Sequence, residues 1–334
     1  MITDKSKHSW SLVADIGGTN ARFAVYDSES RSLQAITHYS VSAFPDFGQA
    51  LDTFLDKVAE SGNWCPLPLA TCLAVACPAD TNIIQFTNSP WRIDRRQLAG
   101  KLGQTRIDII NDFAAVGYAV TDLASQDWHA VGKGESLAGS PIAVLGPGTG
   151  LGVCSLVPVG TDFRVIEGEG GHVNFAPVGA EQLAVFNVLT KRFGRVSVER
   201  LLSGAGISNI YQALGQIRGE PGRYESPAEI TAAALGQRCE LAQHSVHMFF
   251  DVLGTVAGDL ALTLGARGGV YIAGGIVPRL LEFLEGTRLR EQFEAKGRFR
   301  DYLGNIPLRV IVKPDMGLYG AANRLELSDP QIDF

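Results

Sequence analysis

Two glycine-rich turns carry the pattern that points most directly to chemistry. Residues 17–20 (GGTN) lie between two apolar runs, and residues 147–150 (PGTG) lie between two more. The N–H groups of such turns can approach a phosphate because glycine has no Cβ, and Thr19 and Thr149 can each add a hydroxyl donor. Either turn alone is as readily an ordinary tight hairpin, but two of them could clasp one polyphosphate. We therefore expect a phosphate site built from both.

Neither turn matches the common nucleotide-binding loops. A Walker A loop requires Gly-Lys-Ser/Thr, and in a Rossmann unit a helix follows the glycines. Here residues of strand composition follow both turns, at 21–26 and at 151–157. The sequence thus predicts two β-hairpins with glycine tips.

Carboxylates stand beside the first turn and at the end of another strand. Asp15 directly precedes the first turn, where it is either a turn-forming residue or the partner of a magnesium ion held through water. Asn111 and Asp112 follow four β-favouring residues and precede a helix-like segment, a place where α/β proteins bind ligands. Such a pair is often only a helix cap. Asp112 is also our candidate for the carboxylate that accepts the proton of an alcohol during phosphoryl transfer.

A short loop at residues 167–172 (EGEGGH) combines two acids, three glycines and a histidine. Carboxylate and imidazole groups can bind adjacent hydroxyls of a sugar, so we interpret the loop as a polyol site. A metal site at Glu169 and His172 is the competing interpretation, but no third histidine or cysteine is near in the sequence. Glu199, two residues after a predicted helix cap at Ser197, is by itself only an acid in a first helical turn.

The elements that must position these residues alternate between strands and helices, which predicts an α/β fold. Apolar residues at positions 47, 50, 51, 54, 55 and 58 form one stripe of an amphipathic helix. The repeated hairpin design implies two similar halves. Further strands are predicted at 69–76, 107–110 and 270–273, and further helices at 113–123, from the capping box at 226–229, at about 237–264, and from 316.

Composition excludes several classes of protein. With 334 residues, 46% of them hydrophobic and 19% charged, the chain should form two globular domains. A formal net charge of -6 leaves no broad positive surface for nucleic acid. Residues 1–11 are polar, unlike a signal peptide, and the apolar region 246–276 is interrupted by charges, unlike a membrane span. Five cysteines without a C-x-x-C pair indicate reduced thiols, and we expect a cytoplasmic protein.

Five ordered motifs together resemble those of bacterial glucokinases, and the resemblance extends from about residue 12 to residue 322. It implies the actin-like ATPase fold, which is ribonuclease H-like, with a small domain at 1–122 plus 313–334 and a large domain at 123–312 that close over their ligands. It also implies ATP-dependent phosphorylation of the 6-hydroxyl of glucose, the first step of glycolysis, with Mg²⁺, in a cytoplasmic homodimer. The motifs are 15–22 (DIGGTNAR), 110–113 (INDF), 145–152 (LGPGTGLG), 168–173 (GEGGHV) and 272–278 (IAGGIVP).

The resemblance also assigns roles to residues. Asp112 would be the general base, and the sugar hydroxyls would be held by Asn111, Glu169, His172 and Glu199. The nucleotide would be held by Ala14, Asp15, Ile16, Gly17, Gly18 and Thr19 at the first turn, by Gly148, Thr149 and Gly150 at the second, and, near the adenosine, by Ser203, Gly204, Gly274 and Gly275. Asp15 would face Mg²⁺ through water.

Two departures from the family pattern and two alternatives accompany this prediction. Residues 77–82 (CPADTN) differ from the usual Pro-x-x-Gly-Asp near the sugar, so substrate tolerance could differ. The zinc-binding cysteine cluster of the repressor, open reading frame and kinase family is absent, so no structural zinc is expected. The alternatives are a kinase for another hexose and a non-catalytic sugar sensor or assembly protein. A transcriptional regulator would need a DNA-binding domain, for which residues 1–11 leave no room.

Overall fold

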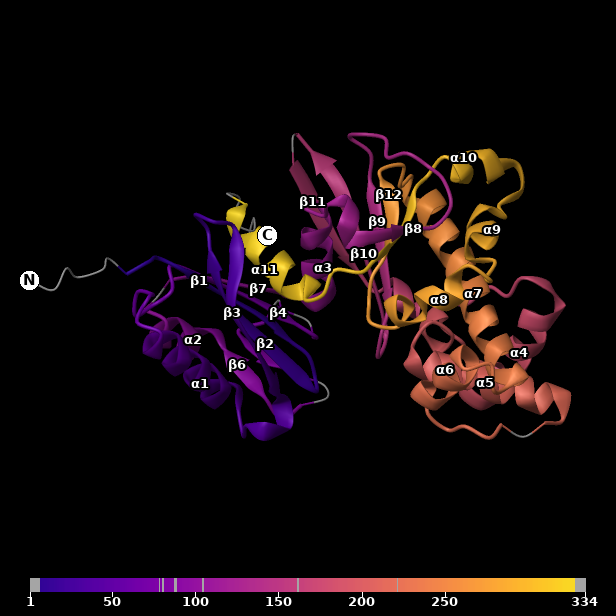
Figure 1. Ribbon diagram of the computed structural model, residues 1–334, viewed down its shortest axis with the longest axis horizontal. Helices are drawn as coiled ribbons and strands as arrows, with labels where there is room; N and C mark the ends of the chain where they lie inside the picture. Colours follow the sequence, from indigo (N-terminus) through magenta and orange to yellow (C-terminus); the bar gives the residue numbers. More distant parts are fainter. Residues whose placement is uncertain are drawn as a thin grey trace, which may run out of the picture. The chain divides into compact units, whose positions relative to one another are not determined.

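The structure is a computed structural model that describes residues 7–77, 79, 81–86, 89–103, 105–160, 162–220 and 222–327. The chain divides into two compact units. Unit 1 comprises Met1–Asp122 and Pro314–Phe334, and unit 2 comprises Leu123–Lys313. Each unit is built around its own β-sheet (Figure 1).

Unit 1 contains a five-stranded sheet in the order β3-β2-β1-β4-β7. β1, β2 and β3 pair antiparallel, whereas β1, β4 and β7 run parallel. A two-stranded hairpin of β5 and β6 lies apart from this sheet. The strands are β1 Ser11–Ile16, β2 Asn20–Asp27, β3 Ser32–Ser40, β4 Ala70–Val75, β5 Ile83–Gln85, β6 Arg92–Asp94 and β7 Arg106–Asn111.

Helices cover both faces of this sheet, as Figure 1 shows. α1 (Phe47–Glu60) and α2 (Arg95–Lys101) pack on one face, and α3 (Asp112–Val120) and α11 (Met316–Glu326) pack on the other. The predicted stripe of α1 is confirmed, since five of its six apolar positions are buried and Leu55 is half-buried. Asp46 caps this helix by accepting a hydrogen bond from Gln49 N.

Unit 2 contains a six-stranded sheet in the order β11-β10-β9-β12-β13-β8. Its first three strands pair antiparallel, and β9, β12 and β13 run parallel. The first five strands therefore repeat the pattern of the sheet in unit 1, which confirms the two similar halves. The strands are β8 Trp128–Ala130, β9 Ile142–Pro147, β10 Leu151–Val159, β11 Asp162–Gly168, β12 Gly269–Ile272 and β13 Leu308–Ile311.

The helices of unit 2 pack with β9, β10, β12 and β13 into one apolar core. α7 lies at its centre and has 15 buried residues. By length and composition α7 is also the one described helix that could cross a membrane, but 67% of its apolar window is buried, as in a core helix of a folded domain. The helices are α4 Gly179–Phe193, α5 Gly204–Arg218, α6 Pro227–Leu235, α7 Glu240–Leu264, α8 Leu281–Leu284, α9 Leu289–Glu294 and α10 Arg300–Gly304.

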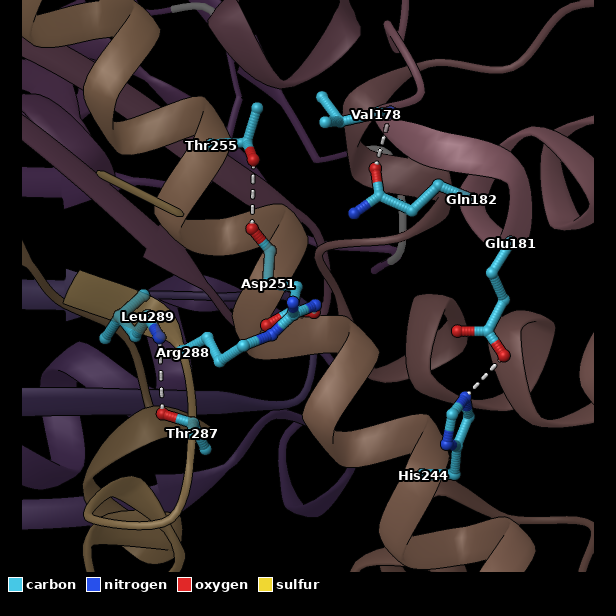
Figure 2. Close-up of polar contacts among 9 residues, drawn as sticks. All are labelled: Val178, Glu181, Gln182, His244, Asp251, Thr255, Thr287, Arg288 and Leu289. Atoms are coloured by element: carbon cyan, nitrogen blue, oxygen red, sulfur yellow. Dashed lines mark hydrogen bonds and ion pairs between the residues drawn. The ribbon is translucent and has the colours of Figure 1, made fainter. Parts of the chain in front are cut away.

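Polar side chains tie α7 to neighbouring segments (Figure 2). Asp251, which is 8% exposed, forms an ion pair with Arg288, just before α9. His244 Nε2 lies 2.7 Å from Glu181 Oε1 on α4. These contacts fix α4 and α9 against α7, and they help to order the helical layer of unit 2.

The predicted helix start at Ser226 is confirmed, with both bonds of a capping box and proline at the first turn of α6. The helix signal at Ser197 gives only a single 3-10 turn, Val198–Arg200, and the Ser197 side chain makes no cap bond. The long helix α5 begins instead at Gly204, because Ser203 caps it by accepting a hydrogen bond from Gly206 N.

Candidate active site

The predicted residues of unit 1 gather at one edge of its sheet. The carboxyl ends of β1, β4 and β7 meet there, since Val75 of β4 pairs with Ile16 on one side and with Asn111 on the other. Only one strand therefore separates the first glycine turn from Asn111 and Asp112. Adjacent strands lie about 4.8 Å apart, so the two groups are on the order of 10 Å from each other at this edge.

The first turn is closed by a hydrogen bond from Gly17 N to Asn20 O of 2.9 Å. Gly17 and Gly18 are half-buried and Thr19 is exposed. Ala14 and Ile16 are completely buried in the core beneath the sheet. Of the nucleotide-binding residues predicted here, these two therefore offer no exposed surface to a ligand in this structure.

Asp15 is held by an ion pair across the hairpin. Arg22 Nη1 donates to Asp15 Oδ2 at 2.7 Å, and Arg22 Nε lies 3.3 Å from Asp315 Oδ1. Burial raises the pKa of Asp15, and the Arg22 guanidinium opposes part of that rise. A Cβ on Gly317 would stand 2.6 Å from Asp15 Cγ, so the first turn of α11 packs directly on this carboxylate.

Asn111 is the N-cap of α3. Its Oδ1 accepts hydrogen bonds from Phe113 N at 2.9 Å and Ala114 N at 3.2 Å. The helix-cap interpretation of this pair is thus confirmed for Asn111, whose Nδ2 can still donate to a ligand. Asp112 occupies the first position of the helix, where the helix dipole favours a carboxylate. Burial and, to a smaller extent, the charge of Asp112 raise the pKa of Cys77 to about 11.

In unit 2 the second turn, which we call the phosphate turn (residues 148–150), is held by several neighbours. Gly148 N donates to Gly150 O at 2.8 Å, and Gly204 N donates to Gly148 O at 2.9 Å. Gly274 has a φ of +83°, and a Cβ there would stand 2.3 Å from Pro147 O. Only glycine suits that position. The structure thus brings three of the predicted nucleotide-binding segments together.

Glu199 lies against the phosphate turn. Its Oε2 accepts a hydrogen bond from Leu151 N at 2.9 Å, and a Cβ on Gly150 would stand 2.5 Å from the same oxygen. Ser203 Oγ donates to Glu199 O at 2.9 Å, which holds the backbone of the 3-10 turn Val198–Arg200 that carries Glu199. Glu199 therefore makes a specific contact with the end of the phosphate turn, which its place in a short helical turn did not predict.

The loop that carries Glu169 and His172, here called the sugar loop (residues 169–173), also packs on β10. A Cβ on Gly171 would stand 2.3 Å from Leu151 O, and a Cβ on Gly170 would stand 2.9 Å from Val153 Cβ. The side chains of Glu169 and His172 are 84% and 59% exposed, with 3.9 Å between Oε2 and Nε2. They are open to a ligand from solvent.

Side chains that commonly bind metals are dispersed over the described residues. Among the described residues, no three His, Cys, Asp or Glu side chains gather to hold a metal ion. None of the five cysteines, all within the described residues, forms a disulfide; Cys72, Cys77 and Cys154 are buried, whereas Cys65 and Cys239 are half-buried. The altered segment at 77–82 includes Pro78 and Asp80, which lie outside the described residues.

Comparison with known proteins decides the family. A family model described as Glucokinase matches residues 12–328. The chain belongs to the glucokinase family. A glucokinase of Hahella chejuensis is 40% identical over 321 residues, which cover 96% of this chain and 98% of the relative. A glucokinase of Chromohalobacter salexigens is 40% identical over 94% of this chain and 97% of its own length.

Solved structures agree with this family. A glucokinase from an Antarctic psychrotroph has a TM-score of 0.86 at 34% identity and covers 96% of this chain and 99% of its own. A ROK hexokinase from Thermus thermophilus has a TM-score of 0.67 at 20% identity, covers 96% of this chain and 100% of its own, and is similar in fold alone. The predicted actin-like ATPase fold is confirmed, with a ribonuclease H-like sheet order in both units.

The sequence analysis missed three residues that contact the predicted site residues: Arg22, Asp315 and Arg195. The contact of Arg22 could have been found from the sequence, because a hairpin that turns at residues 17–20 places Arg22 directly opposite Asp15. No local sequence pattern indicates the contacts of Asp315 or Arg195. Arg195 donates to His172 O and, at 2.8 Å, to Asn174 Oδ1, and these contacts depend on how distant segments pack.

Proposed function

We propose that this chain transfers the γ-phosphoryl group of ATP to the 6-hydroxyl of glucose. Membership of the glucokinase family over residues 12–328 supports this reaction. The observation that carries the proposal is the common sheet edge in unit 1, where Val75 pairs with both Ile16 and Asn111. A phosphate-binding turn and a carboxylate that can accept a proton are thereby held on one rigid frame.

Asp112 is the proposed general base. Phosphoryl transfer needs a carboxylate that orients the attacking hydroxyl and takes its proton, while positioning and charge stabilisation supply most of the catalysis. Position 112 suits this role because Asn111 caps the helix and so fixes its first residue. Asn111 Nδ2, Glu169, His172 and Glu199 are proposed to bind the remaining sugar hydroxyls, whose pattern they would recognise by hydrogen bonds.

The nucleotide is proposed to bind as Mg-ATP. Gly17 N and Gly148 N close their own turns, so Gly18 and Thr19 of the first turn and Thr149 and Gly150 of the phosphate turn would donate N–H groups to phosphate oxygens. Asp15 fits the magnesium ion of this substrate, because Arg22 occupies only one of its two carboxylate oxygens and Mg²⁺ usually keeps several waters. Ser203, Gly204, Gly274 and Gly275, which adjoin the phosphate turn, are proposed for the adenosine end.

The decisive experiment is ADP release with Mg-ATP and, separately, glucose, fructose, mannose and N-acetylglucosamine. Turnover with glucose well above the other three is the expected result. Faster turnover with another hexose would show that this hexose, and not glucose, is the preferred substrate. No turnover with any sugar, in a preparation that binds Mg-ATP, would contradict the proposed function and favour a non-catalytic sugar sensor or assembly protein.

Domain limits, assembly and location complete the proposal. We take residues 1–122 with 313–334 as the small domain and 123–312 as the large one. The resemblance to bacterial glucokinases predicts a homodimer, which we propose for this chain, and light scattering of the purified chain would measure its mass directly. Free cysteines and the use of ATP are consistent with a cytoplasmic enzyme. Fractionation of cells that express the chain would test this location.

A further inference from the structure

One segment of unit 2 joins the sugar loop to the phosphate turn. The start of this linking segment (residues 195–204) contacts the sugar loop, where Val198 N donates to Val173 O at 3.0 Å, and the chain just after that loop, where Phe175 N donates to Val196 O at 3.0 Å. Its far end contacts the phosphate turn, where Gly204 N donates to Gly148 O at 2.9 Å. Glu199 lies midway between these two anchor points.

The Glu199 side chain spans the same gap. Its Oε2 accepts from Leu151 N, the first residue after the phosphate turn, at 2.9 Å. Leu151 O in turn packs against Gly171 of the sugar loop. Within the described residues Glu199 Oε1 makes no hydrogen bond, and the residue is only half-buried. One oxygen is therefore committed to the turn while the other can accept a hydroxyl.

We propose that Glu199 is a positioning residue that couples the two substrates: one carboxylate oxygen holds the phosphate turn through Leu151 N–H while the other binds a sugar hydroxyl. This inference rests on the proposed function, because it takes the sugar and Mg-ATP as the ligands. An anionic acceptor makes a strong, short hydrogen bond, so a carboxylate fixed by the sugar also fixes the N–H groups of the turn. If bound sugar strengthens nucleotide binding by some factor, bound nucleotide must strengthen sugar binding by that same factor, because the coupling free energy between two ligands is reciprocal.

Gly150 gives a way to move this carboxylate without changing it. In Gly150→Ala the new Cβ would stand 2.5 Å from Glu199 Oε2, so the carboxylate must leave Leu151 N. Gly304→Ala, at the end of α10 in the same unit and outside the site, is the matched control, because its Cβ would meet nothing closer than Glu294 Oε1 at 4.0 Å. Neither glycine has a positive φ, so alanine adds no backbone strain at either position.

The first measurement is the Kd of glucose in the absence of nucleotide, by titration calorimetry on the full chain. The Kd should rise by about 10-fold or more in Gly150→Ala, because its sugar ligand is displaced. It should stay within about twofold of the wild-type value in Gly304→Ala. A wild-type Kd in Gly150→Ala would overturn the inference, since a turn residue that acts only on phosphate leaves glucose affinity unchanged.

The second measurement is the ratio of glucose Kd values without and with saturating Mg-AMP-PNP, a non-hydrolysable analogue of ATP. We expect a ratio of about 5 or more in the wild type and about 1 in Glu199→Gln, whose neutral amide keeps the shape but weakens both bonds. Glu199→Gln also carries the test if Gly150→Ala does not fold. An unchanged ratio in Glu199→Gln would overturn the coupling.

These results separate the inference from the proposed function. A wild-type protein that binds none of the four hexoses, with or without Mg-AMP-PNP, would contradict the proposed function itself. A wild-type protein that binds and phosphorylates glucose but shows a ratio of 1 would contradict only the coupling role of Glu199.

Discussion

Arg22 Nη1 donates a hydrogen bond of 2.7 Å to Asp15 Oδ2, directly across the first glycine hairpin. The same guanidinium lies 3.3 Å from Asp315 Oδ1, at the start of α11. One cation therefore serves two carboxylates, one before the first turn and one near the end of the chain. Asp315 has a left-handed backbone, φ 55° and ψ 33°, which for a non-glycine residue is uncommon and is often kept at functional sites.

Replacing Arg22 should move the acid limb of activity to higher pH. Burial raises the pKa of Asp15 and Arg22 lowers it, so Arg22→Gln removes the lowering contribution and the pKa rises further. A carboxyl with a higher pKa loses its charge sooner as the pH falls. The measurement is kcat/KM for ATP from about pH 4.5 to 8, a range above the ordinary carboxyl pKa of about 4, where a carboxyl with a raised pKa titrates.

Arg31→Gln is the control for that experiment. Arg31 is an exposed arginine of unit 1, 3.8 Å from Asp122 Oδ2 and absent from the site. Its pH profile should match the wild-type profile. Superimposable acid limbs for Arg22→Gln and Arg31→Gln would show that the charge of Asp15 does not limit Mg-ATP use.

Cys77 should resist alkylation despite its place beside Asp112. With a pKa raised to about 11, only about one thiol in 3,000 is ionised at pH 7.5, against roughly one in ten for an ordinary cysteine. The thiolate fraction grows as the pH rises toward 11, so labelling should accelerate there. Iodoacetamide labelling followed by mass spectrometry would measure this, with half-buried Cys65 as the internal comparison. Equal labelling rates for both at pH 7.5 would contradict the account.

The close approach of α11 to α3 should make Gly320 intolerant of alanine. A Cβ there would stand 1.6 Å from Ala115 O, so Gly320→Ala must push the helices apart and should lower the free energy of unfolding by about 3 kcal/mol. Gly100→Ala, in α2 with nothing within 4 Å, should raise it by about 0.5–1 kcal/mol. Urea midpoints of the two variants should therefore move in opposite directions; a common direction would count against this packing.

Local patterns in the sequence predicted what depends on neighbours along the chain. The two hairpins follow from glycine tips between apolar runs, and α1 follows from its stripe of Phe47, Ala50 and Phe54. The cap at Asn111 is likewise local, since the side chain bonds to residues two and three positions later. These features need no knowledge of the rest of the fold.

Contacts between distant segments could not be predicted in this way. β3 and β11 are edge strands with largely exposed residues, so neither shows the apolar run of a buried strand. Three contacts in unit 2 join residues more than twenty positions apart. They are the hydrogen bond from Leu151 N to Glu199, the hydrogen bond from Arg195 to His172 O in the sugar loop, and the close approach of Gly274 to Pro147. Ser197 shows the opposite error: a good local cap signal produced only one turn, and the long helix starts later, at Gly204, where Ser203 is the cap.

Steady-state turnover of Asp112→Asn with Mg-ATP and glucose, measured alongside its glucose Kd, tests whether Asp112 is the general base. Asparagine keeps the shape of the side chain but is a poor base. We therefore expect Asp112→Asn to lose about 10²–10⁴-fold in kcat while its Kd for glucose stays within a few-fold of the wild-type value. Asp122→Asn, in the exposed turn after α3, should leave both values unchanged. Near-normal turnover in Asp112→Asn would contradict the assignment of Asp112 as the general base.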